Sequence, residues 1–534
     1  MIKPEVKAFV NGKFYTMKEE GDTCEAVVVR DGKFMMCGTN EEAKRIAREL
    51  DAPVVDLQGR AVVPGFIDIH QHVQAFAQNL QKVNLRDVTS LEELQERIRE
   101  RAKITPKGKL IQGAAFDHEK FKVPVLPTKE DLDKAAPDNP VIIQRYCVHT
   151  NVANSMALEM AGIKKGFVPS RPGTVEFGED GEPTGRLWEQ AAADLVSTIQ
   201  EGGVPYEEIK DMVAMALKES TKFGITGVNP IQGKLCDLYE ETRVYQDLRD
   251  EGRLPVRIYI GYDEFPGIGM KTGLGDEMVK YGFYKIYTDG SLGARSARLK
   301  EPYSDDPQQV GVMNHTQEEL NQLIKTAYDR DLQIGIHAIG DKAIDMALTG
   351  LEACYFENPK EDIRFRLIHT SLIDDGLLER MKKLPIMCDI QPTYVSTNVS
   401  WSDSRVGDRA KNLFAWRRLV DAGLILAGSS DAPVEPINPL LGVYAAVTRC
   451  GYDGYPEGGW HPENKLTRYE AVSLYTKNAA YASFEENIKG TIEEGKLADF
   501  AVLDADVFQV PELEIQNIQV VKTYLSGNET FSRE

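Results

Sequence analysis

Long hydrophobic runs are missing from this sequence of 534 residues. No segment reaches the roughly 18 consecutive apolar residues that a membrane-spanning helix needs. The first residues, MIKPEVKAFVNGKF, also lack the apolar core of a secretory signal. Cysteine is sparse as well: seven residues are scattered along the chain, and none forms a CxxC pair. We therefore expect a cytoplasmic protein without a disulfide framework or a thiolate zinc site.

An excess of basic residues is also missing. The chain has 63 Lys and Arg against 83 Asp and Glu, which gives a formal net charge of -20. Binding to nucleic acid or to an anionic membrane requires a basic surface. The charge balance therefore excludes both as expected partners.

Both ends of the chain are rich in short strand-like runs. Residues 7–17 (KAFVNGKFYTM) and 26–36 (AVVVRDGKFMM) each place Asn-Gly or Asp-Gly between apolar runs, a pattern that predicts a β-hairpin. The last 50 residues show similar runs, and chain ends often lie close together. We predict a small β-sandwich module built from residues 1–61 and 482–534.

Between these ends, short apolar runs alternate with helical patterns. One helical pattern covers residues 316–331 and starts with a threonine followed by glutamate three residues later, which is typical of a capped helix start. Eight such alternations predict an α/β fold, a (β/α)8 TIM barrel over residues 62–481, with an inserted subdomain at about 74–205 after the first strand. The predicted barrel strands lie at 62–70, 224–230, 257–262, 283–289, 333–339, 364–370, 385–391 and 425–431.

The first predicted barrel strand ends in an unusual group of polar residues. The stretch VVPGFIDIHQHV, residues 62–73, is apolar until Asp68, His70 and His72, which are spaced two apart. Side chains on a strand alternate between faces, so these three share one face. Two imidazoles at the buried end of a strand indicate a metal site.

Other predicted strands end in similar residues. Their polar residues are Lys285 and Asp289 on the fourth strand, His337 on the fifth, His369 on the sixth and Asp431 on the eighth. A single histidine on an apolar strand is usually a hydrogen-bonded core residue. Four of the chain's eight histidines together with Asp431, all at the catalytic end of one barrel, instead predict a metal centre.

Five motifs resemble the amidohydrolase superfamily: PGFIDIHQH, KIYTDGSLGAR, IHAIGD, LIHTS and GSSDAPV. The segment from LTRYEAVSLYTKNAAYA to KGTIEEGKLADFAVLD is similar to the family's C-terminal signature. The resemblance spans nearly the whole chain and is nearest to the branch that includes N-substituted formamide deformylase and the YtcJ-like hydrolases.

This resemblance implies a divalent metal centre, expected to be Zn2+, with one or two ions per chain. It assigns His70, His72 and Asp431 to the more buried ion, and His337 and His369 to the more exposed one. A carboxylated Lys285 would bridge two ions, since a carbamate supplies two anionic oxygens where an ammonium group would be repelled.

The implied reaction is hydrolysis of a C–N bond of a small molecule, most simply an N-formyl or N-acyl amide, by a metal-activated hydroxide. Asp431 is expected to act as general base and acid, with His369 or His337 stabilising the oxyanion. Four residues are candidates for substrate contact: His118, His149, Asp289 and Arg295. The alternatives are a loop or helix-cap role for the two histidines, a turn or a supporting role for Asp289, and a surface salt bridge for Arg295.

Two other functions stay open from the sequence. A deaminase or cyclic-amidine hydrolase of the same superfamily would use a single ion and a glutamate on the fifth strand, and IHAIGD carries no glutamate. A non-catalytic scaffold relative would have lost metal ligands, whereas every expected ligand is present. A homodimer is the default expectation for the assembly, because such dimers are the commonest soluble oligomers.

Overall fold

The computed structural model describes residues 5–145, 150–169, 173–189, 191, 195, 203–267 and 269–533. The chain divides into two compact units. The main unit combines residues 1–76 with 210–534, and the second unit contains residues 77–209. Among the described residues, no helix combines the length and the apolar character needed to cross a membrane.

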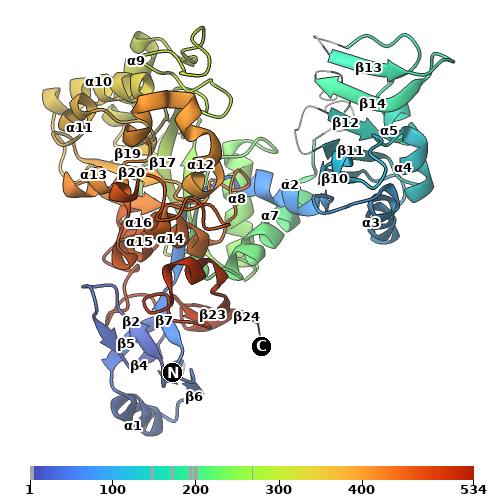
Figure 1. Cartoon of the computed structure of the whole chain (residues 1–534). Coiled ribbons are helices and arrows are strands. Elements are labelled where there is room, and N and C mark those ends of the chain that lie inside the picture. Colours follow the sequence, from blue (N-terminus) through green and yellow to red (C-terminus); the bar gives the residue numbers. More distant parts are fainter. Residues whose placement is uncertain are drawn as a thin grey trace. The chain divides into compact units, whose positions relative to one another are not determined.

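An eight-stranded parallel sheet forms the centre of the main unit (Figure 1). Its ends meet through two hydrogen bonds, from the Asp431 amide to the His70 carbonyl (2.9 Å) and from the His72 amide to the Ala432 carbonyl (2.9 Å). The sheet is therefore a (β/α)8 barrel, as predicted. Its strands follow chain order: β8 (Phe66–Gln71), β15 (Ile225–Pro230), β16 (Arg257–Tyr262), β17 (Val279–Tyr287), β18 (Gln333–Ala338), β19 (Phe365–His369), β20 (Ile386–Ile390) and β21 (Ile425–Gly428).

Helices follow most of the barrel strands, and among the described residues none lies between β16 and β17. The predicted helix at 316–331 is α9 (Gln317–Asp329), and Thr316 and Glu319 form the expected capping box at its start. The other main-unit helices after β8 are α7 (Tyr206–Thr221, which begins in the second unit), α8 (Leu238–Asp250), α10 (Asp341–Glu357), α11 (Asp375–Met381), α12 (Thr393–Val406), α13 (Trp416–Asp421), α14 (Pro439–Thr448), α15 (Arg468–Leu474) and α16 (Lys477–Ala482).

Strands from the two ends of the chain form two further sheets in the main unit. The blue and red strands of this terminal module lie side by side in Figure 1. One sheet has the order β5-β4-β1-β6 and the other β24-β23-β22-β7-β2-β3. Phe9, Phe14, Phe34, Phe500 and Tyr524 belong to the apolar cluster of this module. The strands are β1 (Val6–Val10), β2 (Lys13–Tyr15), β3 (Thr23–Cys24), β4 (Ala26–Arg30), β5 (Lys33–Gly38), β6 (Val54–Asp56), β7 (Ala61–Pro64), β22 (Phe500–Leu503), β23 (Val520–Leu525) and β24 (Asn528–Ser532).

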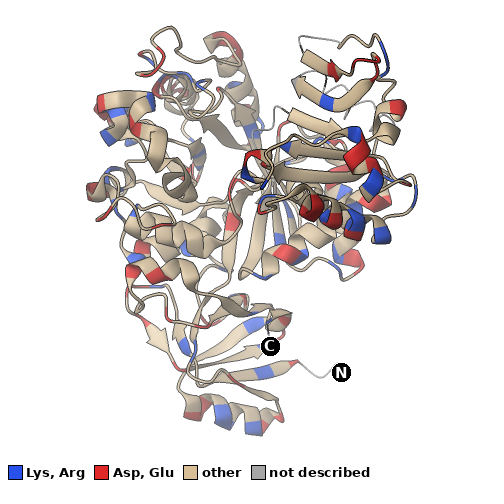
Figure 2. Cartoon of the chain, turned by 45° about the vertical axis from the view of Figure 1, so that its right-hand side comes forward, with Lys and Arg blue, Asp and Glu red and all other residues tan. Residues whose placement is uncertain are grey.

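One of the two predicted N-terminal hairpins is wrong. β4 and β5 do form a hairpin around Asp31-Gly32, but β1 and β2, joined by Asn11-Gly12, belong to different sheets. At this point the chain crosses between the sheets, and Phe9 and Phe14 consequently bury in the same cluster. Helix α1 (Asn40–Leu50), whose acidic and basic residues are interspersed (Figure 2), buries Ala43 and Ala47 against the four-stranded sheet.

The run predicted as one strand at 62–70 is two strands in two sheets. β7 pairs with β22 in the terminal module, and β8 pairs with β15 in the barrel. Gly65 joins them, and its amide donates to the Asp499 carbonyl (2.9 Å). A Cβ at Gly65 would lie 2.8 Å from the Thr226 Cβ and closer still to its Oγ1 and Cγ2, so a side chain does not fit at this junction.

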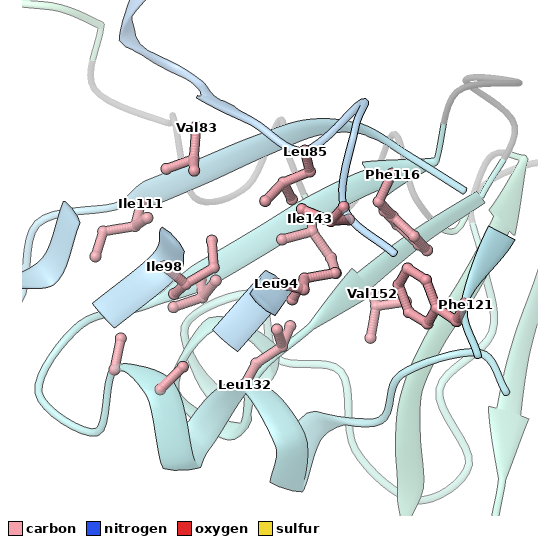
Figure 3. Close-up of a cluster of buried hydrophobic side chains, with 14 residues drawn as sticks. Val83, Leu85, Leu94, Ile98, Ile111, Phe116, Phe121, Leu132, Ile143 and Val152 are labelled. Carbon is pink, nitrogen blue, oxygen red and sulfur yellow. The ribbon is translucent and has the colours of Figure 1, made fainter. Parts of the chain in front are cut away.

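The second unit has its own sheet and core. The sheet has the order β13-β14-β12-β11-β10-β9. Leu94 and Ile98 belong to the same buried cluster as Leu132, Ile111 and Ile143 (Figure 3). The elements are β9 (Val83–Asn84), α3 (Leu91–Ile104), β10 (Ile111–Phe116), α4 (Lys129–Ala135), β11 (Val141–Arg145), β12 (Thr150–Ala153), α5 (Ser155–Met160), β13 (Gly173–Phe177) and β14 (Pro183–Glu189), with α2 (Val73–Gln81) leading into the unit.

Candidate metal centre

Three ligand-type side chains meet where the first and last barrel strands close. The Asp431 Oδ1 lies 3.3 Å from the His70 Nε2 and 3.2 Å from the His72 Nε2. Among the described residues, this is the one group of three or more His, Cys, Asp or Glu side chains whose ligand atoms all lie within 4.8 Å of one another. The Asp431 Oδ1 is buried and has no hydrogen-bond partner of normal geometry. The group has the donor atoms and the spacing to hold one metal ion.

The other two predicted histidine ligands lie beside this group. The ring centroids of His369 and His70 are 5.6 Å apart, and those of His369 and His337 are 4.4 Å apart. Burial lowers the pKa of His70 and of His369 well below the usual value, so both imidazoles are neutral at neutral pH. Neutral imidazole is the form that binds a metal.

Hydrogen bonds determine which ring nitrogen of His369 and of His337 carries the proton. The His369 Nδ1 lies 2.6 Å from the Gln391 Oε1, so the carboxamide oxygen accepts the Nδ1 proton and the Nε2 lone pair is left free. The His337 Nε2 lies 3.2 Å from the Gly290 carbonyl and 3.3 Å from the Asp289 Oδ1. These oxygens make Nε2 the protonated nitrogen of His337, and its Nδ1 is left to bind a ligand.

Lys285 is buried inside the barrel without a hydrogen-bond partner for its Nζ. The Nζ lies 5.0 Å from the centroid of the Tyr287 ring. Burial lowers the pKa of Lys285 to about 7, against an opposing influence of Asp431. A substantial fraction of this amine is therefore uncharged at neutral pH, which is the form that combines with carbon dioxide to give a carbamate.

Asp68 and Asp289 hold the backbone around the ligands. Asp68 accepts from the amides of His70 (3.2 Å) and Ser430 (3.1 Å) and from the Ser430 hydroxyl, and so ties β8 to the loop after β21. Its contact is with the backbone amide of His70, not with the imidazole ring. Asp289 has a fully buried side chain and accepts from the amides of Arg298, Ile339 and Gly340 at 2.9–3.1 Å.

The remaining substrate-contact candidates lie in different places. Arg295 forms a bidentate ion pair with Asp305 at 2.9 and 3.0 Å, which is the salt bridge considered as its alternative. His118 belongs to the second unit, at the start of a short 3-10 helix, and its Nδ1 is buried without a partner. His149 lies outside the described residues. Substrate contact by Asp289, Arg295, His118 and His149 stays a prediction.

Two residues at the site were missed from the sequence. The Tyr394 hydroxyl donates to the Asp431 Oδ2 at 2.7 Å, and Gln391 contacts His369 as described above. Gln391 directly follows β20, so the strand-end pattern that selected the histidines also indicates it. Tyr394 lies in the first turn of α12, where no sequence pattern distinguishes it.

The backbone of the site is strained at three residues. His369, Thr370 and Asp431 have φ values of 73°, 46° and 55°, in the left-handed region that non-glycine residues seldom adopt. Such conformations persist where the surrounding structure holds them, and they are concentrated at functional sites. The strain accordingly lies at the ends of β19 and β21, where the chain turns to present His369 and Asp431.

The fold and this group of side chains define a class of metal-dependent barrel hydrolases. The chain belongs to the amidohydrolase family, whose family model matches residues 53–531. It is 33% identical over 536 residues to the protein YtcJ of Bacillus subtilis (strain 168), which covers 99% of this chain and 100% of that protein. It is 28% identical to N-substituted formamide deformylase of Arthrobacter pascens, over 98% of each chain.

A solved structure agrees with this assignment. The crystal structure of a metal-dependent hydrolase of Pyrococcus furiosus superposes with a TM-score of 0.78 at 29% identity, over 94% of this chain and 100% of that chain. The family and this neighbour indicate a hydrolase, as the sequence motifs predicted.

Proposed function

We propose that this protein is a metal-dependent amidohydrolase that cleaves a C–N bond of a small molecule, most simply an N-formyl or N-acyl amide. The observation that carries the proposal is the convergence of His70, His72 and Asp431 within 4.8 Å at the mouth of the barrel. The similarity to the Arthrobacter N-substituted formamide deformylase supports an amide as the substrate class.

The side chains present fit a divalent ion, for which we propose Zn2+. His70, His72 and Asp431 would hold one ion, and His337, His369 and a carboxylated Lys285 would complete a second position. The unpartnered Asp431 Oδ1 and Lys285 Nζ support this assignment, because buried polar atoms without partners need a ligand. When bound, a divalent ion lowers the pKa of water at the site to about 7 and polarises the scissile carbonyl.

Three residues of the chain have separate roles in the proposed reaction. The Asp431 carboxylate accepts the proton of the attacking water and delivers it to the leaving nitrogen. Tyr394 holds the Oδ2 of the same carboxylate, and so keeps Oδ1 directed at the histidines. His369, fixed by Gln391 at Nδ1, would act on the developing oxyanion through the ion that its free Nε2 would hold.

A single-ion centre is the second candidate, and one observation favours it. The compact group among the described residues contains three ligands, which is enough for one ion. The related deaminase activity would need a glutamate on the fifth strand, and β18 reads QIGIHA. A mononuclear hydrolase is therefore the version of this candidate that the side chains support.

Metal stoichiometry distinguishes the two candidates. Protein purified without chelator is analysed by plasma mass spectrometry, alongside Lys285→Ala and the exposed-lysine control Lys271→Ala. Two ions per chain in the wild type and in the control, falling in Lys285→Ala, support the binuclear site. One ion that is unaffected by Lys285→Ala supports the mononuclear site. Absence of metal, with no hydrolysis of N-formyl or N-acyl amides after Zn2+ or Mn2+ is added, contradicts the proposal.

A further inference from the structure

The terminal module contains a pocket that the proposed hydrolase chemistry does not use. Its volume is about 620 Å3, and it is lined by residues of β3, β5 and the segment 492–494. Two of the lining residues are Cys24 and Cys37, which are both half-buried and free. The pocket therefore brings two thiols, 13 residues apart in the chain, to one accessible place.

These two cysteines belong to different sheets. Cys24 ends β3 in the six-stranded sheet, and Cys37 lies in β5 of the four-stranded sheet. The chain passes from β3 to β4 through the single residue Glu25, whose amide donates to the Gly38 carbonyl at 3.0 Å. This crossing draws Cys24 towards β5, and both cysteines pack against the same apolar cluster.

The two thiols interact with each other. The hydrogen bond with Cys37 is the main cause that lowers the pKa of the Cys24 thiol, and the same contact raises the pKa of the Cys37 thiol. Cys24 is therefore the member of the pair with more thiolate, and the thiolate is the nucleophile in disulfide exchange.

We propose that Cys24 and Cys37 form a dithiol site that reacts with small disulfides and closes into an intrachain disulfide. The Cys24 thiolate attacks one sulfur of a low-molecular-weight disulfide RSSR, and the other sulfur leaves as RS⁻. The Cys37 thiolate then attacks Cys24 in the mixed disulfide, and the second RS⁻ leaves. The net reaction oxidises two protein thiols to one disulfide and reduces RSSR to two RSH.

The charge of the pocket selects the kind of disulfide. Its lining includes Asp22, Glu25, Glu493 and Glu494 against one basic residue, Lys18, whose Nζ lies 3.5 Å from the Glu493 carboxylate. A pocket of this sign attracts cations and repels anions. A cationic disulfide such as cystamine is consequently the preferred reagent, ahead of neutral 2-hydroxyethyl disulfide and anionic glutathione disulfide.

The test uses the full-length protein in its native state. It is incubated with each of the three disulfides at low ionic strength, quenched by alkylation and mapped by peptide mass spectrometry. The expected result is a linked Cys24–Cys37 peptide that forms at least about tenfold faster with cystamine than with glutathione disulfide. This difference should shrink when salt is added.

Cysteine variants distinguish a specific reaction of the Cys24–Cys37 pair from nonspecific reaction of exposed thiols. Cys37→Ser should stop at a stable mixed disulfide on Cys24, and Cys24→Ser should remain largely unmodified. Cys236→Ser, which removes a half-buried thiol in the barrel, should leave the linked peptide unchanged. A wild-type protein that accumulates only mixed disulfides contradicts the dithiol site. Equal rates with the three reagents contradict the charge selection. Neither result depends on hydrolase activity.

Discussion

Two oxygens of one carboxylate have separate partners at the centre of the site. The Oδ1 of Asp431 faces the imidazoles of His70 and His72, and the Oδ2 accepts the hydroxyl of Tyr394. A carboxylate that rotates freely presents either oxygen, whereas one held at Oδ2 presents Oδ1 alone. Tyr394 thus positions a proposed proton-transfer group without itself being a metal ligand.

Replacement of Tyr394 by phenylalanine removes this one contact. A hydrogen bond to a charged group contributes about 1.5 kcal/mol, so kcat for amide hydrolysis should fall about tenfold. Bound metal, measured by plasma mass spectrometry, should stay at the wild-type level because Oδ1 is retained. The control is Tyr444→Phe, which removes a hydroxyl that donates to the Gly451 carbonyl. Equal kcat values in the two variants would contradict the positioning role.

Asp389 offers a second test at the level of single residues. It is fully buried and pairs with the fully buried Arg366 at 2.6 Å, and Arg366 also donates to the Ile69 carbonyl at 2.7 Å. Asp389→Ala leaves a guanidinium uncompensated inside the barrel, which should cost about 3–5 kcal/mol of unfolding free energy. Denaturant unfolding followed by circular dichroism measures this loss. Glu379→Ala, which removes an exposed ion pair with Lys382, should cost about 1 kcal/mol or less.

The presence of polar residues at the ends of apolar strands identified the side chains that lie together at the site. His70, His72 and Asp431 were selected because each follows an apolar run, and their ligand atoms do converge; that they hold a metal stays a prediction. The partners of these residues were harder to find. Tyr394 reaches Asp431 from a helix, and Arg366 meets Asp389 across neighbouring strands, so their contacts depend on the tertiary fold.

At the scale of elements, the junction between β7 and β8 controls where the ligand-bearing strand begins. Gly65→Ala would place a methyl group against the buried Thr226 side chain, which is β-branched and cannot move aside. Overpacking of this kind costs about 1–3 kcal/mol, and here it should also displace β8 and lower metal occupancy. Thermal unfolding and metal analysis measure both effects. Gly267→Ala is the control, because its nearest neighbouring atom lies at 3.8 Å.

Periodicity predicted the barrel strands well and the terminal strands less well. Barrel strands are buried on both faces and bounded by helices, so each stands out as a short apolar run. The Asn11-Gly12 turn carries the same local signal as Asp31-Gly32, yet only the second closes a hairpin. The difference arises because Phe9 and Phe14 bury together between two sheets, a long-range effect that the local turn pattern does not contain.

At the scale of the whole molecule, buried carboxyl groups make stability depend on pH. Burial raises the pKa of Glu241 to about 7, from an ordinary value of 4.5. The folded state therefore binds this proton more tightly than the unfolded state. The resulting stabilisation is fully present below pH 4.5 and is lost as the pH rises through 7. Its size is on the order of 3 kcal/mol.

Glu241→Gln tests this dependence. The variant cannot ionise at this position, so its thermal midpoint should fall less steeply than that of the wild type between pH 5 and pH 8. Glu240→Gln, at the exposed neighbouring position, should keep the wild-type slope. Parallel curves for wild type and Glu241→Gln would show that Glu241 is already charged in the folded protein.

Counting eight alternations was sufficient to predict a closed barrel, because a parallel sheet of this size with helices between its strands has few other solutions. Which strands of the two chain ends pair with one another could not be read in the same way. β7 pairs with β22 across more than 400 residues, and neither strand carries a pattern that specifies its partner.

The pairing of β7 with β22 can form only late in the synthesis of the chain. β7 leaves the ribosome early, whereas β22 (Phe500–Leu503) follows only after all eight barrel strands have been made. Until then one edge of β7 has unpaired backbone groups, and an open edge is a template for association with other chains. The nascent chain therefore carries an open strand edge, prone to association, until β22 has been made and can cover it.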